Sequence, residues 1–213
     1  MAELIFYTNP MSRGQIARWM LEEVGAEYEQ VVLDYGGTMK GPDYLAINSM
    51  GKVPAIVHHG RVVTEGAAIC AYLADVFPEA GLAPADDDER ASYYRWLFFG
   101  AGPVESAVTN KSLGWEPDAK QQGMAGYGSY DRVVDVLHAQ IGGRAFVCGD
   151  RFTAADVYFG SQIIWGTQFG TLPERDSFTA YAARLTARPA YRKAKAIDDA
   201  LIAGIQGKAG LSG

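Results

Sequence analysis

Residues 51–77 read GKVPAIVHHGRVVTEGAAICAYLADVF and contain a complete supersecondary unit. Two short apolar runs, 55–57 and 61–63, flank a turn that contains glycine, and this pattern predicts a β-hairpin. After the hairpin the apolar residues recur at helical spacing, which predicts an amphipathic helix that lasts to the end of the stretch. Pro54 stands just before the first run, a position in which a strand tolerates proline. The stretch therefore predicts a hairpin that leads directly into a helix.

The residues before this unit predict two more strands and two more helices. The expected elements are a strand at 4–7, a helix at 16–24, a strand at 28–33 and at most a short helix near 43–47. Strands that alternate with helices favour parallel pairing, and the hairpin adds antiparallel strands, so the predicted sheet is mixed and four-stranded. The order is thioredoxin-like, although the redox Cys-x-x-Cys motif is absent from the sequence.

Val53-Pro54 before a strand, and Glu65-Gly66 at the start of a helix, resemble the glutathione-binding half of the N-terminal domain of glutathione S-transferases. The resemblance implies a cis Val53–Pro54 bond, with Lys52 and Val53 beside the cysteinyl part of glutathione. It implies further that Glu65 and Gly66 hold the γ-glutamyl end of the peptide. A helix N-terminus suits the carboxylate of that end, and Glu65 suits its ammonium group. Members of the family usually have serine at the position of Gly66, so one hydroxyl contact is missing here.

The rest of the chain is predicted to be helical. Prolines and glycines interrupt the pattern near residue 80, and we predict a thioredoxin-like domain at 1–78, a linker at 79–86 and an all-α domain at 87–213. Thr153 and Asp156 form a capping box, which transferases of this family carry at the start of a buried helix. We expect the last helix at 190–197 and a frayed, glycine-rich tail at 204–213.

The turn between the first strand and the first helix is where this fold delivers side chains to the sulfur of glutathione. The thiolate is the nucleophile, and a hydroxyl that donates to sulfur stabilises the anion. Ser12 is placed to cap the helix and to contact the sulfur, and it matches the residue that is Ser, Cys or Asn in bacterial and theta-like members. Tyr7 is the alternative, because some classes use a tyrosine at the end of the strand. Arg13 either attracts the anionic peptide or is solvated.

An electrophile is expected to bind in an apolar pocket between the two domains. The candidate lining residues are Met11, Trp96, Phe99 and Pro103. Core packing explains each of these residues equally well.

The composition and charge of the chain argue against several classes of function. A net charge of −6 argues against a nucleic-acid surface, and no signal peptide or transmembrane stretch is visible. Cys70 and Cys148 are far apart in sequence, which fits a reducing cytoplasm. His58 and His59 lack a third nearby ligand, so no metal is predicted.

Together these features identify the chain as a member of the bacterial cytosolic glutathione S-transferases of serine type, similar to the theta, beta and nu classes. The resemblance implies a homodimer that activates the glutathione thiol for attack on a small hydrophobic electrophile, or for reduction of a peroxide or disulfide. Two alternatives stay open: a glutathione-dependent isomerase or dehalogenase, and a non-catalytic glutathione-binding or stress-response protein. The change to Gly66 supports the non-catalytic alternative.

Overall fold

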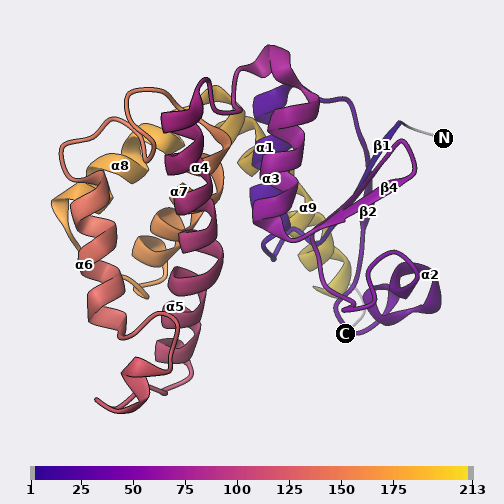
Figure 1. The fold of residues 1–213 in the computed structure, drawn as a ribbon. Helices are drawn as coiled ribbons and strands as arrows, with labels where there is room; N and C mark the ends of the chain where they lie inside the picture. Colours follow the sequence, from indigo (N-terminus) through magenta and orange to yellow (C-terminus); the bar gives the residue numbers. More distant parts are fainter. Residues whose placement is uncertain (1–2, 211–213) are drawn as a thin grey trace. The chain divides into compact units, whose positions relative to one another are not determined.

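The computed structural model describes residues 3–210, which form two compact units. Figure 1 shows the elements of each unit along the chain. The sheet unit contains the residues up to Ala80 together with those from Arg188 onward, and the helical unit contains Gly81–Ala187. The two units are described separately below.

The sheet unit contains a four-stranded sheet in the order β2-β1-β3-β4. Its strands are β1 (Leu4–Thr8), β2 (Glu29–Val32), β3 (Ala55–His58) and β4 (Arg61–Thr64). β1 pairs with β2 in parallel and with β3 antiparallel, and β3 and β4 form the hairpin. The predicted mixed, four-stranded sheet and the predicted order of its elements along the chain are therefore confirmed.

Side chains of β1 alternate between two packed faces, as the period of a strand requires. Phe6 lies under α1 (Gly14–Val24), with the Arg18 guanidinium 5.2 Å from its ring centre. On the opposite face Tyr7 packs against Tyr44 of α2 (Pro42–Leu45), with ring centres 5.4 Å apart. The short turn η1 (Thr38–Lys40) completes that second layer, and α3 (Gly66–Val76) packs beside α1.

The last helix, α9 (Pro189–Gly210), packs along α1 and belongs to the sheet unit. The predicted end of this helix at 197 is wrong, and so is the predicted frayed tail over residues 204–210, because the helix continues to Gly210. Residues 211–213 of the expected tail lie outside the described part of the chain. Half-buried and buried positions continue at helical spacing as far as Ile205, so packing outweighs the low helix propensity of the glycines. The domain boundaries at 78 and 87 stay a prediction. They place α9 in the all-α domain, whereas α9 packs on α1 of the sheet unit.

A buried ion pair joins α9 to α1. Arg18 Nε donates to Asp198 Oδ1 at 2.8 Å, and the two side chains are 0% and 2% exposed. Burial raises the pKa of Asp198 to about 6, although the neighbouring Arg18 charge opposes the shift. Arg18 also donates to the Tyr28 hydroxyl at 3.1 Å. The pair fixes the register between two helices that are far apart in sequence.

The helical unit follows a short turn, η2 (Pro78–Ala80). Its helices are α4 (Asp87–Phe99), α5 (Glu105–Ser112), α6 (Tyr130–Ile141), α7 (Ala154–Gln168) and α8 (Asp176–Thr186), with a short turn η4 (Gln121–Gly123) before α6. Asp86 caps α4 by accepting the backbone N–H of Glu89 at 2.8 Å. Pro103 lies in a π-helical turn, η3 (Gly100–Val104), that connects α4 to α5. A turn of this kind accommodates the missing N–H of a proline.

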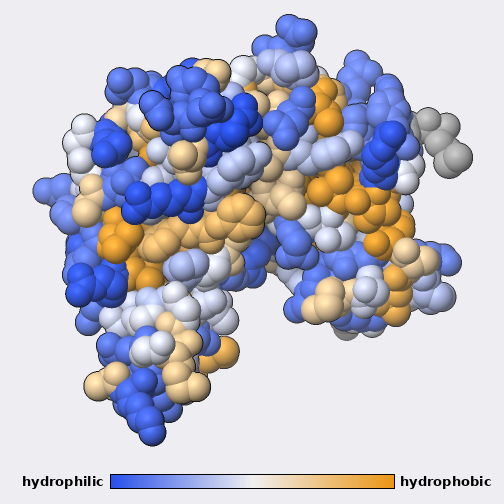
Figure 2. All heavy atoms as spheres, viewed as in Figure 1, coloured by the Kyte–Doolittle hydropathy of each residue, from blue (hydrophilic) through white to orange (hydrophobic). Residues whose placement is uncertain are grey.

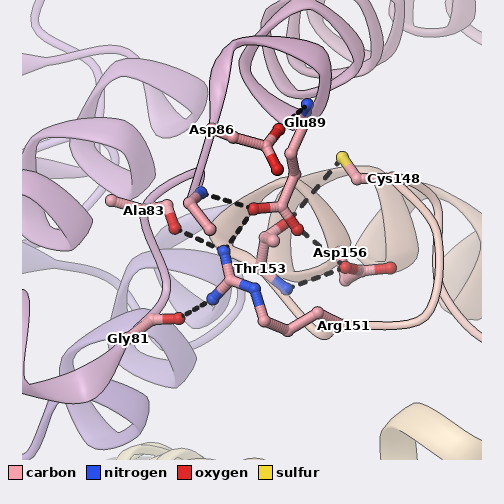
Figure 3. A network of polar contacts seen from close by, with 9 residues as sticks. Gly81, Ala83, Asp86, Glu89, Cys148, Arg151, Thr153 and Asp156 are labelled. Carbon is pink, nitrogen blue, oxygen red and sulfur yellow. Dashed lines mark hydrogen bonds and ion pairs between the residues drawn. The ribbon is translucent and has the colours of Figure 1, made fainter.

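Arg151 connects the start of the helical unit to the turn before α7 (Figure 3). Its guanidinium donates to the carbonyls of Gly81 and Ala83 and pairs with the Glu89 carboxylate. Because three acceptors from the segment around the start of α4 meet one side chain, this arginine fixes that segment.

The capping box of α7 is present as predicted. Asp156 is fully buried and accepts the backbone N–H of Thr153 at 2.9 Å, that of Val147 at 2.7 Å, and the Tyr181 hydroxyl at 2.6 Å. Burial raises the pKa of Asp156 to about 6, and these hydrogen bonds oppose the shift. The carboxylate thus joins α7, α8 and the preceding loop.

Thr153→Ala is expected to lower the free energy of unfolding by about 0.5–2 kcal/mol, because the capping hydroxyl is lost at a buried helix start. The Michaelis constant for glutathione is expected to stay unchanged. Chemical denaturation and steady-state kinetics check the two effects. Thr109→Ala, at an exposed position of α5, is the control and is expected to change stability by less than about 0.5 kcal/mol. A purely kinetic defect in Thr153→Ala would contradict the structural role.

No helix among residues 3–210 is both long and apolar enough to span a bilayer. Figure 2 shows hydrophilic residues interspersed with the apolar ones over the face that it views.

Candidate active site

Strand register brings three predicted site segments to one end of the sheet. Tyr7 pairs with Ala55, and Ala55 pairs with Thr64. The turn after β1, the residues before β3 and the start of α3 must therefore lie side by side. We call this end of the sheet, with segments 8–14, 51–54 and 65–66, the site edge.

Asn9 builds the first of these segments. Its side chain is buried, donates to the Leu33 carbonyl at 2.8 Å and accepts the backbone N–H of Met11 at 2.9 Å. The first bond attaches the turn after β1 to the residue that follows β2, and the second fixes the turn internally. Asn9 is not among the site residues predicted from the sequence, because its partner Leu33 lies 24 positions away.

Ser12 lies partly exposed in the same turn. Its hydroxyl donates to the Asn9 carbonyl at 2.6 Å and accepts the backbone N–H of Gly14 at 2.9 Å. The predicted N-cap position is corrected by one residue, because Arg13 holds that position and makes no side-chain capping bond. Ser12 still satisfies the N–H of the first helical residue, which is the physical task of a cap.

Gly14 is required by close packing at the start of α1. A Cβ built there would lie 2.1 Å from Thr8 Oγ1 and 3.1 Å from Ser12 Oγ. Thr8 is fully buried on β1, so a Cβ at position 14 would force a buried side chain to shift. Glycine therefore allows the turn to place Ser12 close to the strand end.

Tyr7 occupies a different environment from Ser12. It packs against the cluster formed by Leu33, Met39, Tyr44 and Ala55. Burial, together with the charge of Glu29, raises the pKa of the Tyr7 phenol. Its half-buried ring packs on the α2 side of the sheet.

The second segment of the site edge contains a cis Val53–Pro54 bond, as predicted. The carbonyl of Lys52 accepts the Tyr44 hydroxyl at 2.5 Å and the Asn48 side-chain amide at 2.8 Å. Two donors on a single carbonyl fix the orientation of the backbone that leads into Val53. The Lys52 side chain itself is exposed.

Glu65 begins the third segment with an unusual backbone. Its φ is +66° and its ψ is 118°, in a region that residues other than glycine rarely adopt. The side chain is exposed and does not cap α3. Strained residues of this kind concentrate at ligand sites, where the surrounding structure maintains them. Gly66 follows as the first residue of the helix.

The candidate pocket residues lie in both units. Met11, 51% exposed, belongs to the sheet unit, whereas Trp96, Phe99 and Pro103 belong to the helical unit. Trp96 is 3% exposed and makes edge contacts with Phe99 and Phe159 at 5.3 and 5.8 Å. Core packing explains Trp96, while Phe99 and Pro103 are partly exposed. Among the residues that the structure describes, no group of three or more His, Cys, Asp or Glu side chains is arranged to hold a metal.

Comparison with known proteins agrees with this geometry. Residues 2–75 match the family described as glutathione S-transferase, N-terminal domain. Glutathione S-transferase 3 of Zea mays is 30% identical over 209 residues, which cover 91% of this chain and 93% of the maize protein. Protein LigF of a Sphingobium species is 48% identical over 79 residues, which span only 36% of this chain and 31% of LigF. The solved structure of a sphingomonad glutathione S-transferase complexed with glutathione superposes with a TM-score of 0.75 at 27% identity, covering 92% of this chain and 98% of that one.

Proposed function

Since this chain belongs to the glutathione S-transferase family and is a glutathione transferase, we propose that it is a serine-type enzyme in which Ser12 stabilises the glutathione thiolate. The observation that carries the proposal is the hydroxyl of Ser12 at the site edge, on the same sheet end as the exposed Glu65. Ser12 and the rival Tyr7 are both half-buried. Ser12 lies in the turn itself, beside the start of α1, whereas the Tyr7 ring packs against Tyr44 of α2 and its cluster.

The three segments suggest a way to hold the peptide. Glu65 would pair with the γ-glutamyl ammonium group, and the free N–H groups at the start of α3, including that of Gly66, would bind the neighbouring carboxylate. The backbone of Val53, oriented beside Pro54, would pair with the cysteinyl unit. The exposed cations Lys52 and Arg13 would attract the anionic peptide.

Thiolate stabilisation requires Ser12 to change its acceptor. In the structure its single proton goes to the Asn9 carbonyl. That carbonyl also accepts the Ser12 backbone N–H at 3.1 Å, so it keeps a partner if the hydroxyl turns toward sulfur. The Gly14 N–H donates to the same oxygen, and this bond polarises the hydroxyl as a donor. The thiol proton leaves to solvent, and the sulfur electron pair forms the new bond to an electrophilic carbon. The bond from that carbon to its leaving group breaks, and the leaving group departs to solvent with the bonding electron pair, as halide when the substrate is an aryl halide.

The finer assignments belong to the same proposal. We propose a small hydrophobic electrophile as the second substrate, and the predicted contacts Met11, Trp96, Phe99 and Pro103 belong to that proposal. The resemblance to theta, beta and nu classes supports a homodimer, and the absence of closely spaced cysteines supports the cytoplasm. Activity on a peroxide or disulfide, an isomerase or dehalogenase, and a binding or stress-response protein are the remaining alternatives, of which Gly66 favours the last.

Glu65→Ala is expected to weaken glutathione binding at least tenfold, because a hydrogen bond to a charged group contributes about 1.5–3 kcal/mol. Glu65→Gln is expected to fall between Glu65→Ala and wild type, since it keeps an acceptor without the charge. Isothermal titration calorimetry gives the three affinities. Glu27→Ala, at an exposed position before β2, is the matched control. Unchanged affinity in Glu65→Ala would reject the γ-glutamyl assignment.

A further inference from the structure

Tyr35 makes a contact with the site edge that the sequence did not predict. It lies between β2 and η1, its side chain is 51% exposed, and its hydroxyl donates to the Met11 carbonyl at 2.9 Å. The partner lies 24 positions earlier in the chain. An exposed phenol that reaches across to one particular backbone carbonyl is available for a positioning role.

The bonded carbonyl belongs to the peptide unit that precedes Ser12. A peptide unit is planar, so its C=O and the next N–H move together. Tyr35 holds the C=O end of the Met11–Ser12 unit, and the Asn9 carbonyl holds its N–H end at 3.1 Å. With both ends held, rotation of the unit is restrained, and so is the direction of the Ser12 Cα–Cβ bond, about which the hydroxyl still turns.

The Tyr35 bond becomes more important when Ser12 acts. While the Ser12 hydroxyl is bonded to Asn9, the turn has its own internal support. Once the hydroxyl turns toward sulfur, that support is lost, and the bonds from Tyr35 and to Asn9 remain. We propose that Tyr35 is a positioning residue of the thiol site, which keeps Ser12 aimed at sulfur by holding the Met11 carbonyl. This inference rests on the proposed role of Ser12.

Tyr35→Phe removes one oxygen atom from an exposed side chain and tests the inference in the full-length enzyme. We expect kcat to fall about threefold to tenfold, the size of effect that one hydrogen bond supports. The pKa of the glutathione thiol, read from the profile of kcat against pH, should rise. The affinity for glutathione should stay the same. Tyr94→Phe, at a tyrosine of α4 that is 44% exposed, is the matched control and should match wild type in all three measurements.

A double-mutant cycle with Ser12→Ala distinguishes failure of the inference about Tyr35 from failure of the proposed role of Ser12. If Tyr35 acts through Ser12, the double variant should be no slower than Ser12→Ala alone. Additive losses would overturn the inference, and so would an unchanged kcat and pH profile in Tyr35→Phe. A Ser12→Ala enzyme that behaves like wild type would instead reject the proposed function. Thermal melting of each variant verifies that the fold is intact.

Discussion

Asp198→Ala is expected to lower the free energy of unfolding by about 3–5 kcal/mol, the cost of removing one partner of a buried ion pair. The substitution leaves the guanidinium of Arg18 with no exposed surface and without its 2.8 Å partner. Loss of this bond also loosens α9 from α1, so the effect is larger than that of any surface pair. Denaturant unfolding followed by circular dichroism measures it.

Asp199→Ala is the matched control on the same helix. Asp199 is 55% exposed and pairs with Lys195 four residues earlier, an arrangement that contributes only about 0.3–0.5 kcal/mol. The free energies of unfolding of the two variants should be compared at pH 8. Burial raises the pKa of Asp198 in the folded protein to about 6, above the ordinary value of 3.8, so the folded protein takes up a proton first as the pH falls. At pH 8 the carboxylate is ionised in both the folded and the unfolded protein. Equal losses in the two variants would contradict a specific contribution from the buried pair.

Ser12→Ala is expected to lower kcat/KM about 10- to 150-fold, because one charge-assisted hydrogen bond to the thiolate is worth about 1.5–3 kcal/mol. Glutathione binding should change little, since Glu65 and the backbone of Val53 are untouched. Steady-state kinetics with a small aryl halide checks the rate, and calorimetry checks the affinity.

Ser12→Thr separates loss of the hydroxyl from damage to the turn. It keeps an oxygen that can accept from Gly14 and donate to sulfur, so it should recover part of the lost rate. Ser106→Ala, at an exposed serine of α5, should behave like wild type. Equal rates for Ser12→Ala and wild type would show that another group carries the thiolate.

Local patterns in the sequence were sufficient to predict most elements of the sheet unit. The hairpin, the proline before β3 and the helix after it depend on neighbouring residues, and the structure has all three. The capping box at Thr153 is likewise a pattern within four residues. Such features are predictable because both partners lie within a few positions of each other.

The contacts that refine the site were not predictable in this way. Tyr35 reaches Met11 and Asn9 reaches Leu33 across 24 positions, and both bonds depend on parallel pairing of β1 with β2. The extent of α9 was missed for a similar reason. Arg18 and Asp198 are 180 positions apart, so the packing that sustains a glycine-containing helix is invisible to local propensity.

A pH titration of the thiolate absorbance of bound glutathione tests the role of Ser12 most directly, with wild type, Ser12→Ala and Tyr7→Phe compared. We predict a thiol pKa below that of free glutathione in wild type and in Tyr7→Phe, and a return toward the free value in Ser12→Ala. A lowered pKa that survives in Ser12→Ala but is lost in Tyr7→Phe would contradict the account and move the role to the tyrosine. A thiol pKa that is not lowered in any of the three proteins would contradict it as well and favour a glutathione-binding protein without this chemistry.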